Sequence, residues 1–226
     1  MTALTECETR LRKAVDELEE CQEAQIFFTQ HGTIAEHIGD AEKAFARASS
    51  WYDIHLDPAL QLNFIRFDRM ACHWRIERPK IKLTGEFRIH HLLASLVMDA
   101  PPLDWGSTES ERQLYSELRV IDDYPGGGTG TFAALRIQPD NPMPEVWYHD
   151  FRVGAFKLDL DYCEYLDALT ITKGTFGWQY LYADVQLAGI DFIEVATDMK
   201  DMLDVFPGLF PEYDYAPLRA RLEART

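Results

Sequence analysis

The chain has 226 residues, of which 46% are hydrophobic and 12% aromatic, and this is enough apolar material for one sizeable core. Its 38 acidic residues outnumber its 22 basic residues, and the formal net charge of −16 argues against non-specific binding to nucleic acid or to an anionic membrane. No apolar run approaches the roughly 20 residues of a membrane span, and the charged start does not resemble a signal peptide. We therefore expect a cytoplasmic protein with one large domain. The excess of acid permits a basic protein partner.

The first helix is predicted over residues 3–29, because apolar and small side chains recur there with a heptad spacing. We expect residues 1–32 to form a helical arm that packs on a domain of residues 33–226. A dimerising coiled coil is the alternative, although the small residues at one heptad position weaken it, so the chain is expected to be a monomer or a dimer. A second helix is predicted from Ile34 to Arg47.

A loop is expected after the second helix, and Trp51 and Tyr52 in that loop are expected to pack onto the domain. Asp57 and Pro58 then predict the start of a third helix, with aspartate as its N-cap and proline as its first residue.

The pattern changes to strict alternation between Met70 and Glu77, which predicts the first strand of a sheet. Further strands are predicted at residues 83–93, 118–121, 131–137, 145–149 and 153–158. The fourth and fifth of these six strands read as a hairpin joined by a proline-rich turn. Short helices are predicted at residues 109–118, 197–205 and 218–224. The fold class is therefore α+β, with a mainly antiparallel, twisted sheet packed by helices.

The clearest local signals lie between Val153 and Val185. Asp161 and Glu164 have the spacing of a capping box at the start of an amphipathic helix, and Lys173 with Gly174 supplies the matching stop. The acidic residues of this stretch are explained as caps and its aromatic residues as core. The stretch is therefore expected to hold the sheet and helix layers together without being a functional site.

The glycine cluster after Tyr124 is a possible phosphate-binding loop. However, no lysine follows it as in a P-loop, and a strand follows where a dinucleotide-binding fingerprint needs a helix. We therefore expect a β-turn in this place. The four cysteines lack the spacing of a zinc site and are expected to be reduced, structural thiols.

Catalytic residues cannot be singled out from the sequence, and we expect no enzyme activity, no metal and no cofactor. The alternative is a metal-dependent or small-molecule enzyme in which the fold brings His73, His90, His149 and Asp150 together. A scaffolding protein that dimerises through its N-terminal helix is a further alternative.

Several motifs occur in an order known from one protein family. They are Ile38 to Glu42, Leu56 to Leu60, Gly128 to Phe132, Val146 to Asp150 and Leu158 to Leu169. Over residues 34–186 the chain resembles the SMI1/KNR4, or SUKH, superfamily. It departs from the family pattern at Asp57, which stands where leucine and proline are usually adjacent.

The resemblance implies binding without catalysis, because bacterial members of the family are mainly immunity proteins that hold a cognate toxin inactive in the cytoplasm. The acidity of this chain suits a basic toxin. The contact surface is expected on the variable loops, with the partner-binding residues Trp105, Asp122, Asp123, Tyr124 and Asp150.

Overall fold

Seven strands form one antiparallel sheet in the computed structural model, which describes residues 3–102, 106–124, 126–127 and 130–226. The strands follow one another in chain order across the sheet. They are β1 (Ala24–Gln30), β2 (Arg69–Arg78), β3 (Ile81–His90), β4 (Leu118–Asp123), β5 (Phe132–Gln138), β6 (Asn141–Asp150) and β7 (Gly154–Lys157). The predicted α+β class with an antiparallel sheet is confirmed, as is the hairpin of β5 and β6.

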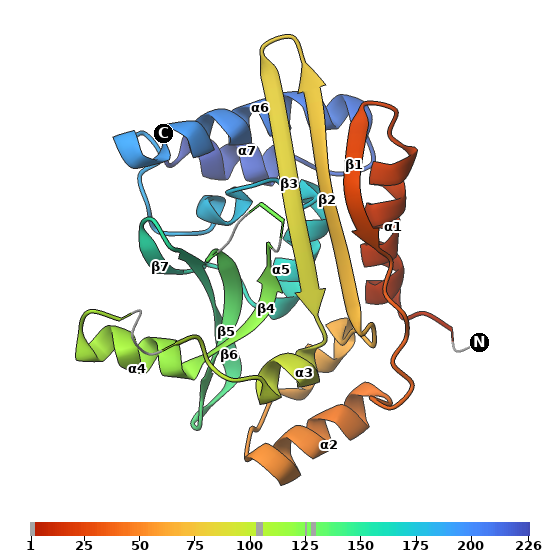
Figure 1. Ribbon diagram of the computed structural model, residues 1–226, viewed down its shortest axis with the longest axis vertical. Helices are drawn as coiled ribbons and strands as arrows, with labels where there is room; N and C mark the ends of the chain where they lie inside the picture. Colours follow the sequence, from red (N-terminus) through yellow and green to blue (C-terminus); the bar gives the residue numbers. More distant parts are fainter. Residues whose placement is uncertain (1–2, 103–105, 125, 128–129) are drawn as a thin grey trace.

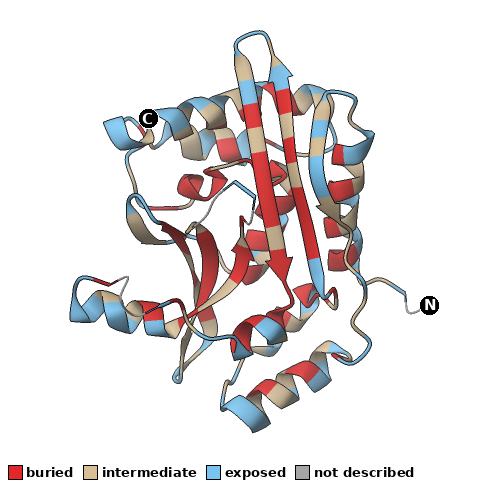
Figure 2. Cartoon of the chain, in the orientation of Figure 1, coloured by how far each residue is buried: buried red, intermediate tan, exposed pale blue. Residues whose placement is uncertain are grey.

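The helices surround this sheet (Figure 1). They are α1 (Glu6–Glu20), α2 (Ala41–Tyr52), α3 (Leu92–Val97), α4 (Glu109–Glu117), α5 (Tyr162–Thr172), α6 (Ile193–Leu209) and α7 (Ala216–Glu223), with 3-10 turns η1 (Pro58–Asn63), η3 (Trp178–Leu181) and η4 (Ile190–Phe192). Buried residues run along the central strands and the inner helix faces (Figure 2). Within the described part of the chain, every helix is too short or too polar to cross a bilayer.

The sheet opens between β3 and β4. Strands β2 and β3 pair along their whole length, from Arg69 opposite His90 to Arg78 opposite Ile81. In contrast, β3 meets β4 only where Ile89 faces Asp122. Figure 1 shows the two halves of the sheet diverging, with α5 in the space between them.

The turn after α5 fills this opening. The capping box of Asp161 and Glu164 starts the helix as predicted, and Lys173 ends it in the left-handed conformation. The next residues pair with β3 like a short strand: the Glu86 N–H donates to the Gly174 carbonyl (2.9 Å), and the Phe176 N–H donates to the Thr84 carbonyl (3.0 Å). These bonds satisfy the backbone groups of β3 that β4 does not reach.

The indole of Trp74 fixes the same turn from β2. Its Nε1–H donates to the Lys173 carbonyl (2.7 Å). The ring lies over Gly85 so closely that a Cβ at this position would stand 2.5 Å from it. Glycine is therefore required at this position of β3.

Lys173 connects three parts of the chain that are far apart in sequence. Its side chain is fully buried, its ammonium pairs with the Glu17 carboxylate of α1, and it lies 4.1 Å from the centre of the Tyr213 ring. Burial lowers the pKa of Lys173 to about 8, although Glu17 acts in the opposite direction. α1 is thereby fixed to the core of the domain.

The predicted helix over residues 3–29 is wrong beyond Glu20. Residues 24–30 form the edge strand β1, in which Phe28 faces His73 of β2. The heptad match at Phe28 is a coincidence of spacing, because the aromatic and β-branched residues of this stretch favour a strand once β2 is available for pairing.

The next two predicted helices are shifted. α2 begins at Ala41 rather than Ile34, because Gly39 takes a positive φ and Asp40 caps the helix. α2 then continues to Tyr52, where a loop was expected, and leaves Trp51 and Tyr52 exposed. The third helix is only the 3-10 turn η1, although Asp57 caps it as predicted.

Two later boundaries also differ. The strand predicted to reach Leu93 ends at His90, because His91 caps the short helix α3. The helix predicted over residues 197–205 is longer at both ends, since α6 begins at Ile193 and continues to Leu209 in spite of Pro207.

We expect Gly174→Ala to lower the free energy of unfolding by about 2 kcal/mol or more. Gly174 has a φ of +68°, and an added Cβ would stand 2.8 Å from the Phe87 ring and 3.1 Å from the Glu86 carbonyl oxygen. Urea denaturation measures the change. Gly208→Ala is the matched control, because a Cβ there meets nothing within 4 Å. Equal effects of the two substitutions would contradict the role of the turn.

Candidate ligand-binding cleft

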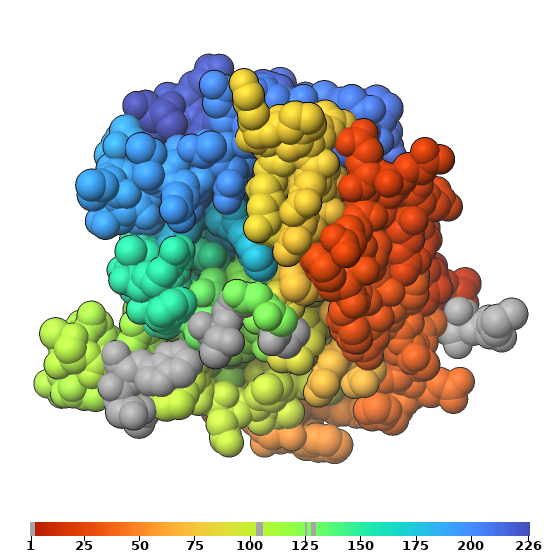
Figure 3. Space-filling view, turned by 45° about the horizontal axis from the view of Figure 1, so that its top comes forward, coloured from red at the N-terminus to blue at the C-terminus, as the bar shows by residue number. Residues whose placement is uncertain are grey.

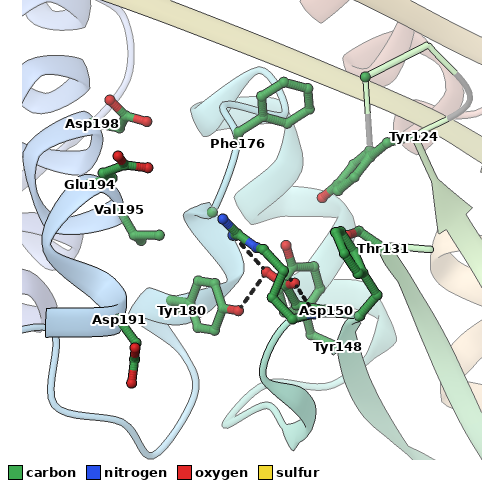
Figure 4. Close-up of a pocket in the computed structure, with 14 residues that line it drawn as sticks. Tyr124, Thr131, Tyr148, Asp150, Phe176, Tyr180, Asp191, Glu194, Val195 and Asp198 are labelled. Carbon is green, nitrogen blue, oxygen red and sulfur yellow. Dashed lines mark hydrogen bonds and ion pairs between the residues drawn. The ribbon is translucent and has the colours of Figure 1, made fainter. Parts of the chain in front are cut away.

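A cleft of about 330 Å³ lies between the end of β6 and the start of α6. Figure 3 looks onto this side of the molecule, where the segment between β6 and β7 and the segment leading into α6 border a hollow. In the close-up of Figure 4, acidic side chains of η4 and α6 face aromatic side chains of β6 and η3 across the cleft.

Aromatic rings form the floor. Tyr148 and Tyr180 are almost completely buried and pack edge to face, with ring centres 5.2 Å apart. Tyr124 and Phe176 form a second such pair at 5.5 Å. Phe176 and Tyr180 reach this place because the turn after α5 pairs with β3 and continues directly into η3.

Three carboxylates form the wall. Asp191, Glu194 and Asp198 are spaced three and four residues apart, so they lie on one face of the continuous segment of η4 and α6. None of the three has an ion-pair partner among the described residues. Burial, together with repulsion from Asp201 and Glu194, raises the pKa of Asp198 to about 6.

The basic side chain that lines the cleft is already neutralised. Arg152 donates to both oxygens of Asp150, with Nη2 2.9 Å from Oδ2, and the Tyr180 hydroxyl also donates to Oδ2 (3.0 Å). Burial acts to raise the pKa of Asp150, but these hydrogen bonds outweigh it and lower that pKa. The net charge of the cleft is therefore negative, and a cationic group fits it best.

A buried polar network supports the floor. The Tyr165 hydroxyl donates to Asp122 Oδ2 (2.6 Å), and the Arg88 N–H donates to Asp122 Oδ1 (2.9 Å). Gln179 Nε2 donates to the hydroxyls of Tyr124 and Tyr165. Burial raises the pKa of the Asp122 carboxyl to about 7.

The glycine turn beside the cleft is held by an acid rather than open to an anion. The buried carboxylate of Glu86 accepts from the N–H groups of Gly126 (2.6 Å) and Gly127 (2.7 Å). A phosphate would need free amides of this kind, and the protein's own side chain occupies these two. The expectation of a turn agrees with this geometry for the two described glycines.

The residues predicted to bind a partner have different positions. Asp122 is completely buried, so its side chain is unavailable to another protein. Tyr124 and Asp150 are also buried, but both line the cleft. Asp123 pairs with Arg88 and accepts from His90.

Trp105 lies outside the described residues. Asp191, Glu194 and Asp198 of the cleft wall were not among the residues predicted from the sequence. Their spacing of three and four residues, which places them on one helix face, was the signal that could have identified them.

The histidines of the alternative enzyme site have separate surroundings. His73 packs on the Phe27 ring, with ring centres 4.9 Å apart, and His90 contacts Asp123. His149 stacks on Phe132 and has Nδ1 3.0 Å from the Gly130 carbonyl.

In the described part of the chain, the group of side chains that could share a metal ion is a different one on the surface, formed by Asp16, Glu19 and His31. There the two ring nitrogens of His31 each face one carboxylate.

No family model matches the chain, and neither a curated protein nor a solved structure is significantly similar to it.

We expect Asp122→Asn to change the pH dependence of stability. The folded state holds the Asp122 pKa at about 7, above its ordinary value of 3.8, so this carboxyl favours folding below pH 4 and opposes it as the pH rises through 7. The unfolding free energy of the variant relative to the natural protein should therefore rise between pH 4 and pH 8, by about 4 kcal/mol at most. Urea denaturation at several pH values measures this.

Asp123→Asn is the matched control at the neighbouring position. Burial opposes ionisation of Asp123, but His90 and Arg88 outweigh it and lower its pKa. Its variant should therefore lose stability relative to the natural protein as the pH rises. The same pH trend for both variants would contradict the assignment of the buried proton to Asp122.

Proposed function

We propose that the chain is a non-catalytic protein-binding module, and that its cleft receives a lysine or arginine side chain of a basic partner. The observation that carries this proposal is the acidic wall of Asp191, Glu194 and Asp198, which has no ion-pair partner among the described residues and stands opposite an aromatic floor. Carboxylates attract the charged head of such a side chain, and aromatic faces add a cation–π contribution of about 0.5–2 kcal/mol.

The negative charge of the whole chain also favours binding of a basic partner. A net charge of −16 raises the association rate with a basic protein, since complementary charge steers the encounter. The partly buried Asp198 would contribute more than an exposed acid, because its charge is less screened by solvent. Steering and local recognition therefore select the same class of partner.

At a finer level we propose an SMI1/KNR4-like immunity protein that neutralises a basic toxin in the cytoplasm by direct binding. The sequence resemblance supports this proposal, and the α+β class with an antiparallel sheet is compatible with it. In this reading the basic partner is the toxin, and the cleft is a part of the contact surface.

The two alternative functions have less support. In α1, the apolar residues Cys7, Leu11 and Leu18 are buried in the chain's own core, so that face is not free for a coiled coil. The histidines proposed for an enzyme contact different neighbours, as described above. Binding of a basic partner involves the acidic cleft, whereas neither alternative function does.

The experiment uses the proteins encoded beside this chain in its genome. We expect one of them to be basic, to arrest growth when produced alone, and to be harmless when produced together with this chain. Glu194→Gln combined with Asp198→Asn should weaken the complex about tenfold or more, because it removes the wall charges that meet the cation. Isothermal titration calorimetry measures the affinity, and growth measures the protection.

Glu36→Gln combined with Asp140→Asn is the matched control, since both acids are exposed and lie outside the cleft. It changes the net charge equally and should affect affinity much less. The proposed role of the cleft fails if the two double variants bind alike. The proposed immunity function fails if no neighbouring gene product binds the chain.

A further inference from the structure

An exposed aromatic side chain stands at the rim of the acidic cleft. Phe151 lines the cleft and is 65% exposed, and Val153 of the same turn is 38% exposed. Both lie in the segment that joins β6 to β7, which borders the hollow in Figure 3. Short turns normally carry glycine and polar residues, whereas aromatic rings are enriched where proteins contact one another. The rim therefore offers an apolar contact next to the acidic wall.

Hydrogen bonds on both sides of Phe151 fix its backbone. Asp150 closes the turn, because its Oδ1 accepts from the Arg152 N–H (2.9 Å) and its carbonyl accepts from the Val153 N–H (3.1 Å). Asp150 is itself buried and accepts from the Tyr180 hydroxyl of the floor (3.0 Å). The turn that presents the Phe151 ring is therefore tied to the floor of the cleft.

The charged side chains of this turn are already paired with each other. Arg152 donates to both oxygens of Asp150, so its charge is neutralised within the turn and the Phe151 ring is left for a partner. Apolar surface also lies on the other side of the cleft, where Val195 belongs to the helix that carries the acids. Val195 packs on Gly177, at which an added Cβ would stand 3.0 Å from it. The cleft therefore combines charge for a cation with apolar surface for an uncharged neighbour of that cation.

We propose that the cleft recognises two adjacent residues of its protein partner: a lysine or arginine that enters it, and a large apolar residue that packs on Phe151. This inference rests on the proposed function, because the cation is the one that the acidic wall would receive. Neighbouring residues of an extended segment are about 3.3 Å apart along the chain, so the residue beside the inserted one lies at the rim.

Phe151 is in this account the residue that determines specificity. The acids attract any basic segment, since their attraction depends on charge alone. Packing on the Phe151 ring removes apolar surface from water on both partners, and this gain exists only for a segment with a large apolar side chain beside the cation. The partner is therefore selected among basic proteins by the residue that adjoins its inserted lysine or arginine.

The test compares three probes: the N-acetylated dipeptide amides arginyl-phenylalanine, phenylalanyl-arginine and arginyl-glycine. Each is titrated into the full chain, and the backbone amide signals are followed by NMR. The better of the two phenylalanine probes should bind about three- to tenfold more tightly than the glycine probe, because its ring is partly buried on Phe151. Its saturable shifts should include Phe151 and Val195. Equal affinities of all three probes, or shifts that map elsewhere, would overturn the two-residue recognition.

Two variants separate the ring from the acids. Phe151→Ser should lower the affinity of the better phenylalanine probe to that of the glycine probe, and should leave the glycine probe unchanged. Phe28→Ser is the matched control, because Phe28 is 52% exposed on β1 outside the cleft and its loss should affect no probe. Phe151 is mostly exposed, so its substitution should leave urea denaturation unchanged. An equal loss of affinity for all three probes in Phe151→Ser would contradict the assigned role of the ring.

The glycine probe also distinguishes failure of this inference from failure of the proposed function. Its binding should weaken when Glu194→Gln is combined with Asp198→Asn, since the arginine then meets fewer charges. If the glycine probe depends on these acids but phenylalanine adds no affinity, only the role of Phe151 is overturned. If the glycine probe does not bind, or binds the double variant equally well, the acidic wall receives no cation and both proposals fail.

Discussion

The hydrogen bonds between β3 and the turn after α5 connect two half-sheets that otherwise meet at a single bridge. At this junction the Glu86 N–H of β3 donates to the Gly174 carbonyl of the turn, and the Phe176 N–H of the turn donates to the Thr84 carbonyl of β3. Trp74 adds a third bond from β2 to the Lys173 carbonyl. The junction tolerates little change, since Gly85 and Gly174 both lie against side chains that leave no room for a Cβ. The opening of the sheet is therefore a fixed feature of the fold.

The same junction produces the cleft. Phe176 makes the last backbone hydrogen bond of the turn to β3, and the chain then continues into η3. This path places Phe176 and Tyr180 opposite the acids of η4 and α6. The network around Asp122 holds Tyr124 and Tyr165 in place below, and Glu86 holds the glycine turn at one side. Among the described residues, most polar groups that line the cleft have a partner inside the protein, whereas the three acids of the wall have no ion-pair partner. This contrast is why the acids point to a ligand.

Local patterns were enough to predict part of this structure. The capping box at Asp161, the alternation in β2 and the hairpin of β5 and β6 depend on residues close in sequence. β1 was missed because its strand character depends on pairing with β2, more than 40 residues later. The pairing of Lys173 with Glu17 and the separate surroundings of the histidines are likewise long-range effects of packing. No short motif encodes them, so the candidate site could not be assembled from the sequence.

If the acidic wall receives a cation, the ionisation of Asp198 must respond to that cation. Its pKa can be measured by carboxyl ¹³C NMR with and without saturating n-butylguanidinium, a mimic of an arginine side chain, and with n-butylurea as the neutral control. The account predicts a pKa of about 6 in the free protein and a fall toward the ordinary range with butylguanidinium alone, because a bound cation favours the charged carboxylate. A pKa that is the same with both compounds would contradict it.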